Sequence, residues 1–149
     1  MPSRARACWL IVSSPANYQR TRALRFTQQG VKSYYLRYVE KMAPGDGIVW
    51  YVTTIGTFAA TAEIASPYFE SRKRIWLSEG RPDPYPWRVR IQNAHSVAAE
   101  AGVRAGALVP KLRFVKKWPA AHWRLAFQGM LHELPASDFA VIARALAKA

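Results

Sequence analysis

The sequence predicts an α+β fold in which a sheet or small β-barrel is surrounded by helices. Segments rich in β-branched and aromatic residues are bounded by turn residues, as strands are, near 8–13, 47–53, 57–65 and 85–92. Other segments repeat apolar residues at helical spacing, above all 34–42 and 135–148. Half of the 149 residues are hydrophobic, so a single domain over 1–149 can bury a core, with residues 1–7 as a frayed basic end.

The first elements are predicted to be a strand and a helix. Cys8–Val12 is apolar on both sides, which is typical of a central strand. Ser14 precedes Pro15 and marks the start of a helix, because serine caps orphan amides and proline suits the first helical position. This helix is expected over about 15–27, and Gln28-Gln29-Gly30 ends it.

The unit from Gly30 to Val52 is the centre of the prediction. Residues 34–42 place apolar side chains on one face of a short helix, and Pro44-Gly45-Asp46 is a turn signal that ends it. Residues 47–52 are apolar and rich in strand-forming types, which predicts a buried strand. A helix joined by a tight turn to a central strand can hold a ligand at the end of that strand.

Two further strands and a long loop are predicted next. Residues 53–56 connect a hairpin to the strand at 57–65, and 66–84 is irregular. Loops of that length in compact domains are often functional. The segment from Tyr85 alternates, which predicts a strand with one apolar side and one basic side: Trp87, Val89 and Ile91 against Arg88 and Arg90.

In the last third of the chain, the sequence leaves the secondary structure undecided between helix and strand, except in the final helix. Residues 96–106 are rich in alanine and helical in pattern, although two glycines weaken the pattern, and 108–115 fits a helix or a strand. Residues 123–134 fit a strand pair bent at Gly129 or a helix. Residues 135–148 are predicted to form the terminal helix.

The charge balance points to a polyanionic partner. The chain has 22 Lys and Arg against 9 Asp and Glu, a formal charge of +13. Nucleic acid is the first candidate partner and an anionic membrane surface the second. The alternative is that the charge serves solubility alone.

Several classes of function are disfavoured. Cys8 is the single cysteine, which excludes disulfides and cysteine zinc sites within one chain. The three histidines lack metal-ligand spacing, and no Walker A or dinucleotide glycine pattern occurs, so we expect no cofactor, no metal and no enzyme chemistry. Without an apolar run of 18 residues or a signal sequence, we expect no membrane insertion and a cytoplasmic location. The oligomeric state is left open.

Several motifs together carry a family resemblance: WLIVSSPANY, GVKSYYLRYVEKMAPGDGIVWYV, ATAEIASPYF, YPWRVRI and KLRFVKKWPAAHWRLAFQGMLHELPASDF. From about Trp9 to Leu146 the chain resembles the EVE domain of the PUA-like superfamily, in its small stand-alone prokaryotic form. The resemblance implies a curved, barrel-like sheet and a pocket related to that of YTH domains, which read a modified base. EVE proteins often carry Trp shortly before the Gly-Val pair and Asn soon after it. Here those places hold Thr27-Gln28-Gln29 and Lys32-Ser33-Tyr34-Tyr35.

A base pocket needs a flat apolar slot, a few hydrogen-bonding groups and a cationic rim. The candidates for its walls and polar groups are Ser13, Ser14, Asn17, Tyr18, Gly30, Val31, Lys32, Tyr51 and Trp76. Core packing is the alternative for each aromatic residue, and helix capping is the alternative for the polar residues after the first strand. The resemblance favours Tyr51. Because Trp50 and Tyr51 point to opposite faces of a strand, one slot takes both only if the strand bulges.

Phosphate contacts position a nucleic acid without reading its sequence. The candidates are Arg72, Lys73, Arg74, Arg88, Arg90, Lys111, Lys116 and Lys117, for which a solvated charged face is the alternative. The sequence therefore predicts a nucleic-acid-binding module that reads a modified base in DNA or RNA. One alternative is a small hydrolase of modified nucleosides, which needs a buried Lys or Glu at the pocket. Another is a protein that binds a peptide or an anionic surface.

Overall fold

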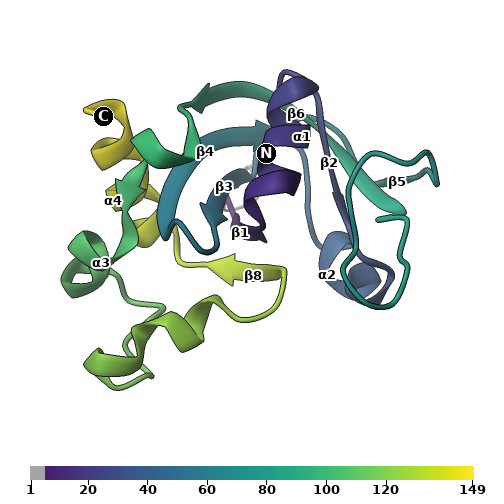
Figure 1. Cartoon of the computed structure of the whole chain (residues 1–149). Helices are drawn as coiled ribbons and strands as arrows, with labels where there is room; N and C mark the ends of the chain where they lie inside the picture. The colour runs from purple at the N-terminus through teal and green to yellow at the C-terminus, as the bar shows by residue number, and fades with distance from the viewer. Residues whose placement is uncertain (1–5) are drawn as a thin grey trace.

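A curved sheet forms the centre of the computed structural model, which describes residues 6–149. Its strands lie in the order β2 (Gln28–Val31), β6 (Trp87–Ser96), β4 (Thr57–Ile64), β3 (Gly47–Val52), β1 (Cys8–Ser13) and β8 (Leu131–Leu134) (Figure 1). The short strands β5 (Phe69–Glu70) and β7 (Val103–Arg104) pair with β6 and β4. The predicted α+β fold with a curved sheet is confirmed.

The pair β1 and β3 is parallel, whereas the other strand pairs are antiparallel. Both strands are continuous apolar runs because both faces of the sheet are covered here. Their register places Ser13 beside Val52, so the carboxyl ends of the two strands lie side by side. The residues that leave these two ends therefore meet at one edge of the core.

Ordinary alternation along β3 places two neighbouring aromatic residues in different cores, beside a bulge in β4. The β3–β4 register passes from Trp50–Ala60 to Tyr51–Phe58, so Ala59 is an extra residue in β4. Trp50 packs in the core under α1. Tyr51 packs in the second core, under the C-terminal helix and residues 105–127.

The helix α1 (Pro15–Ala23) begins where the sequence predicts, with the Ser14 hydroxyl accepting a hydrogen bond from the Asn17 amide at 3.1 Å. It ends four residues earlier than predicted, because Arg25 and Phe26 adopt positive φ angles of 56° and 53°. The chain then enters β2, so the predicted end of the helix at Gln28–Gly30 is wrong. A 3₁₀ turn, η1 (Ser33–Tyr35), and the short helix α2 (Leu36–Val39) follow.

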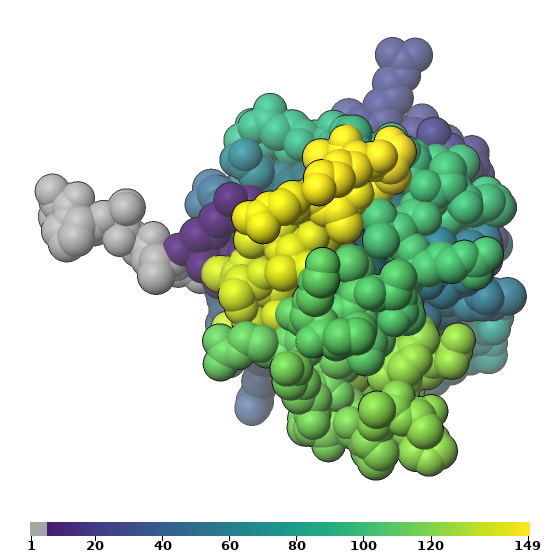
Figure 2. Space-filling view, turned by 90° about the vertical axis from the view of Figure 1, so that its left-hand side faces the viewer, coloured from purple at the N-terminus to yellow at the C-terminus, as the bar shows by residue number. Residues whose placement is uncertain are grey.

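The last third is mostly short turns around one long helix. It contains η2 (Ala99–Ala101), α3 (Ala105–Leu108), η3 (Val109–Lys111), η4 (Ala120–Phe127) and α4 (Ala136–Ala147). The predicted terminal helix is confirmed, and Figure 2 shows it (yellow) lying beside the segment that follows β6 (green). The segment 123–134 is the end of η4 and then β8, with Gly129 at positive φ between them. No helix within 6–149 is long and apolar enough to cross a bilayer.

The predicted frayed end at 1–7 falls mostly outside the described residues, since 1–5 are not described. Its last two residues are held. The Ala7 amide donates to Asp46 Oδ1 at 3.2 Å, and the Arg6 guanidinium lies 4.9 Å from the centre of the Phe139 ring. The Asp46 carboxylate also accepts from Trp9 Nε1 at 3.0 Å, which ties the start of the chain to the turn before β3.

Candidate functional site

A cavity of about 480 Å³ opens at the carboxyl ends of β1 and β3. It is bounded by the first turn of α1, by η1, by the long loop at 66–86 and by the turn before β8. This size is in the usual range for small-molecule sites. We call it the first cavity.

Hydroxyl groups and a helix N-terminus form one side of the first cavity. Ser13, Thr53 and Thr54 follow directly from the two parallel strands, and the Thr53 amide donates to the Ser13 carbonyl at 2.9 Å. Ser14 caps α1, whose first turn contains no acidic residue. The positive end of the helix dipole therefore faces this space and favours electron-rich groups in a ligand.

Three aromatic side chains line the same space: Tyr35 from η1, and Trp76 and Tyr85 from the long loop. The Trp76 and Tyr85 rings are 6.0 Å apart at 36°. Trp76 Nε1 donates to Thr21 Oγ1 at 2.9 Å, and Tyr35 Oη accepts from the Met130 amide at 2.9 Å. The Trp76 and Tyr35 rings are thus each held by a polar contact with another element.

Gln29 is a buried amide whose orientation is fixed by its neighbours. Its Oε1 accepts from Thr21 Oγ1 at 2.9 Å and from Trp50 Nε1 at 2.8 Å. Its Nε2 donates to the Gly30 carbonyl at 2.7 Å. Since an amide nitrogen has two hydrogens, Gln29 can offer the second to a ligand in the first cavity, which it lines.

Asn17 fastens the long loop to α1. Its Nδ2 donates to the Leu77 carbonyl at 2.8 Å and to Tyr85 Oη at 3.2 Å, and its Oδ1 accepts from the Leu77 amide at 2.7 Å. Both of its donor hydrogens are used in this way, so Asn17 acts as a positioning residue. Burial raises the pKa of Tyr85, which keeps that hydroxyl protonated as a donor to the Leu77 carbonyl at 2.9 Å.

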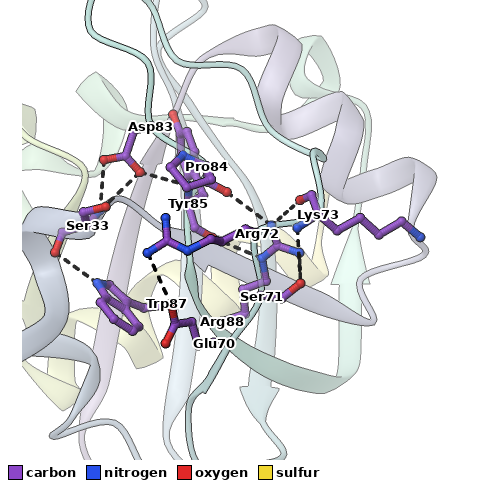
Figure 3. A network of polar contacts seen from close by, with 10 residues as sticks. All are labelled: Ser33, Glu70, Ser71, Arg72, Lys73, Asp83, Pro84, Tyr85, Trp87 and Arg88. Carbon is purple, nitrogen blue, oxygen red and sulfur yellow. Dashed lines mark hydrogen bonds and ion pairs between the residues drawn. The ribbon is translucent and has the colours of Figure 1, made fainter.

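Arg88 is not a phosphate ligand, contrary to the sequence prediction, because it is buried beneath the loop (Figure 3). Its guanidinium donates to the Tyr85 carbonyl at 3.0 Å, to Ser71 Oγ at 3.1 Å, to the Pro84 carbonyl at 3.2 Å and to the Lys73 carbonyl. It also lies 5.1 Å from the centre of the Trp76 ring. Burial lowers the pKa of Arg88, while the surrounding acceptors replace water.

The loop end is held by Asp83, whose carboxylate accepts from the Ser33 amide at 3.1 Å and the Tyr85 amide at 2.9 Å (Figure 3). Tyr85 adopts a positive φ of 54°, a conformation that side chains rarely take and that these contacts maintain. The strand β6 accordingly begins at Trp87, two residues later than predicted.

The close approach of β2 to this loop requires Gly30. A Cβ at this position would lie 2.6 Å from Trp76 Cζ3 and 2.9 Å from the Tyr85 carbonyl oxygen. Gly30 and its neighbour Val31 are buried behind the wall of the first cavity and do not line it.

The structure brings five predicted pocket residues to the first cavity: Ser13, Ser14, Asn17, Lys32 and Trp76. Tyr18 instead lies in the core, where its hydroxyl donates to the Ala59 and Val97 carbonyls at 3.1 and 2.7 Å. Tyr51 stacks on Phe127 at 4.0 Å in the second core, so its predicted place in the pocket is wrong. Alternation along β3 is unbroken, so Trp50 and Tyr51 lie on opposite sides of the sheet, and the bulge at Ala59 affects β4 alone.

The predicted phosphate residues other than Arg88 are exposed but fall into separate groups. Arg72, Lys73 and Arg74 lie on the long loop, and Arg72 pairs with Glu70 at 3.4 Å. Arg90 lies on β6, over the Phe69 ring at 5.2 Å. Lys111, Lys116 and Lys117 lie on the segment before η4, at the other end of the molecule (Figure 1). The first cavity itself is lined by one cation, Lys32, and one acid, Glu79.

Sequence reasoning missed several residues that line the first cavity: Gln29, Tyr35, Thr53, Thr54, Leu77, Glu79, Tyr85, Gly129 and Met130. The two threonines could have been found, because they follow a strand predicted to be central. Tyr85 was assigned to a strand, although the prolines on both sides of it indicate an irregular segment. Gly129 and Met130 reach the cavity only through the pairing of β8 with β1.

No protein-family model and no curated protein matches the chain by sequence. Solved structures do match it in fold. A protein from Rhodopseudomonas palustris is 17% identical with a TM-score of 0.58 over 95% of this chain and 94% of its own. A protein from Pseudomonas putida is 16% identical with a TM-score of 0.59 over 93% and 98%.

YTH domains match over a similar span. The YTH domain of the Zygosaccharomyces rouxii MRB1 protein, solved in complex with N6-methyladenosine RNA, is 15% identical with a TM-score of 0.67 over 98% of this chain and 87% of its own. The YTH domain-containing protein mmi1, solved in a complex with RNA, is 9% identical with a TM-score of 0.62. The chain therefore shares the fold of YTH domains, and its place in the EVE family stays a prediction.

Proposed function

We propose that this chain binds nucleic acid and reads a base, modified in the natural target, in its first cavity. The observation that carries the proposal is the arrangement of three aromatic side chains and a fixed amide around one space at the strand ends. Stacking on an aromatic ring contributes roughly 1–3 kcal/mol per base. The amide and hydroxyl groups supply the hydrogen bonds that tell one base edge from another.

The cavity is closed on several sides, so a base must leave its stack to enter. A single strand or a flipped nucleotide meets this condition at least cost. Trp76 and Tyr85 would cover the base on the loop side and Tyr35 on the side of η1, while Gln29 offers an N–H from β2. A modified base would be recognised by the fit of its added group against these walls.

Two further observations support a nucleic-acid partner. The formal charge of +13 favours a polyanion, and the exposed cations of the long loop lie close in sequence to Trp76. Among the proteins of the same fold, the YTH domain of Zygosaccharomyces rouxii was solved with N6-methyladenosine RNA. We propose binding without catalysis, because Lys32 is only half-buried and Glu79 is exposed, whereas a catalytic group of a hydrolase is expected to be buried.

The test uses calorimetric titration with a panel of nucleosides that includes adenosine and N6-methyladenosine, and anisotropy titration with matched RNA and DNA oligonucleotides. The variant Ala16→Trp places a large side chain at the lining of the first cavity, and Ala23→Trp places it on the same helix away from the cavity. We expect Ala16→Trp to weaken binding at least tenfold and Ala23→Trp to leave it unchanged. Equal binding of modified and unmodified oligonucleotides at every salt concentration would contradict the proposal that the chain recognises a base modification.

A further inference from the structure

A second cavity, of about 540 Å³, lies on the other side of the turn at 128–130. Its apolar lining is aromatic and aliphatic, from Tyr38, Phe114, Trp118 and Leu125. Two cations, Arg113 and Lys117, and one acid, Glu133, also line it, so its charged rim is positive on balance. The site proposed above uses none of these groups.

Two polar atoms of this second cavity are unusual. Among residues 6–149, Trp118 Nε1 and His132 Nε2 are the buried side-chain nitrogen or oxygen atoms that have no hydrogen-bond partner. Buried polar groups are normally paired, because an unpaired one costs about 1–3 kcal/mol. Both residues line the second cavity, and a ligand that displaces the atoms covering these two nitrogens would supply the missing partners.

The two atoms differ in character. An indole nitrogen is only a donor. Burial lowers the pKa of His132, and the charge of nearby Lys117 lowers it further, so the ring is neutral at pH 7. Because the ring also hydrogen-bonds the backbone of Gln128, its second nitrogen is left as an acceptor. One donor and one acceptor match the edge of a nucleobase, which presents both.

A row of tyrosines joins the two cavities. Tyr35 lines the first and Tyr38 the second, and their rings are 5.4 Å apart. Tyr34, 81% exposed, lies 5.0 Å from Tyr35. These spacings are comparable to one nucleotide step, roughly 3.4 Å for stacked bases and more for splayed ones.

The turn between the cavities is thin. A Cβ on Gly129 would lie 3.1 Å from Tyr35 Oη and 3.8 Å from His132 Nε2, so one glycine separates a residue of the first cavity from a residue of the second. A strand that leaves the first cavity can therefore cross this turn and reach the second within a short length.

We propose that the second cavity binds a base of a neighbouring nucleotide in the same single strand, stacked on Tyr38 and hydrogen-bonded by Trp118 and His132. The proposal rests on base binding in the first cavity. Arg113 and Lys117 contact the phosphates of that segment and would join cations far from the first cavity to one binding surface. The partner is thus a single-stranded RNA or DNA of at least a few nucleotides.

The test is anisotropy titration of the full chain with labelled oligonucleotides of one, three and five nucleotides that carry the base preferred by the first cavity. At one salt concentration, the single strands are compared with a stable hairpin whose stem contains the five-nucleotide sequence. The variants are Tyr38→Ala and Trp118→Phe, which removes the unpaired N–H and keeps an aromatic ring. The matched control is Tyr68→Ala, since Tyr68 is 37% exposed against 40% for Tyr38 and lies beside Trp87 instead.

We expect affinity to rise with length for the single strands and to be lower for the hairpin than for the five-nucleotide strand. Tyr38→Ala and Trp118→Phe should each weaken binding of the longer strands, by roughly tenfold for the tyrosine, and leave the single nucleotide unaffected. If these variants, the control and the natural chain bind the longer strands equally, the proposal that the second cavity binds a base is refuted. If Ala16→Trp binds as tightly as the natural chain while Tyr38→Ala does not, the first cavity is refuted as the base site instead.

Discussion

A substitution of Arg88 can show whether its guanidinium stabilises the long loop or binds nucleic acid. We consider Arg88→Met, which keeps a long apolar side chain against Trp76 and removes the guanidinium. The change leaves the Tyr85 and Pro84 carbonyls without their hydrogen-bond donor inside the loop. The Lys73 carbonyl also loses its donor, but water can replace it because Lys73 is exposed. A hydrogen bond from a charged group contributes about 1.5–3 kcal/mol, so two of them amount to about 3–6 kcal/mol.

A loss of this size lowers the midpoint of thermal unfolding by roughly 10 °C or more in a domain of this length. It should also expose the long loop to trypsin, which cleaves after Arg72, Lys73 and Arg74. The matched control is Arg90→Met, because Arg90 lies two residues along the same strand but is exposed. We expect the control to change stability by less than about 1 kcal/mol.

The opposite outcome would refute this reasoning. If Arg88 contacted a phosphate, Arg88→Met would leave stability unchanged and reduce the slope of log affinity against log salt by about 0.7 for a single strand. The two roles thus predict different results in thermal unfolding and in salt-dependent binding. A stable Arg88→Met protein with a reduced slope would return Arg88 to the phosphate-binding residues.

Three further outcomes follow from the same contacts. Gly30→Ala should push Trp76 aside, destabilise the fold by about 1–3 kcal/mol in urea unfolding and weaken base binding. The control is Gly106→Ala, whose new Cβ would lie 3.4 Å from its nearest atom, and it should be neutral or stabilising. Burial raises the pKa of Tyr18 to about 12 from an ordinary value of 10, so its share of the stability is complete below pH 10 and is lost as the pH rises to about 12. Urea unfolding at pH 9 and pH 11 should therefore show a fall that Tyr18→Phe reduces, and an equal fall in both proteins would contradict this. Asp138→Asn removes one of the two carboxylate oxygens that accept backbone amides at 2.8–3.0 Å, and should cost about 1–3 kcal/mol in the same assay; an unchanged midpoint would contradict it.

The parts of the fold that the sequence predicts are those that local pattern decides. The strands β1 and β3 are continuous apolar runs, α1 begins at a serine followed by proline, and α4 has clear helical periodicity. By contrast, β2 is a strand because it pairs with β6, which lies far along the chain. Its own residues, Gln28–Val31, carry no strand pattern that could outweigh the preceding helix.

In the candidate site, too, the residues set by local sequence pattern were predictable, and those set by distant contacts were not. Ser13, Ser14 and Asn17 were predictable because they leave the first strand and begin a helix. Tyr51 was misplaced because alternation turns it to the face opposite Trp50, and no local pattern shows that Phe127, far along the chain, covers that face. Arg88 was misread because alternation along a strand gives its side but does not show that a distant loop covers that side.

The most direct test of base binding is a titration with a nucleoside followed by ¹H–¹⁵N NMR. The chain has six tryptophans, so its indole signals can be resolved and assigned by substitution. With N6-methyladenosine, or the nucleoside that binds best in the panel, we expect saturable shifts of the Trp76 indole and the Gln29 side-chain amide, and none of the Trp118 indole. Saturable shifts confined to other parts of the chain, or no shift at millimolar nucleoside, would contradict the proposal that the first cavity reads a base.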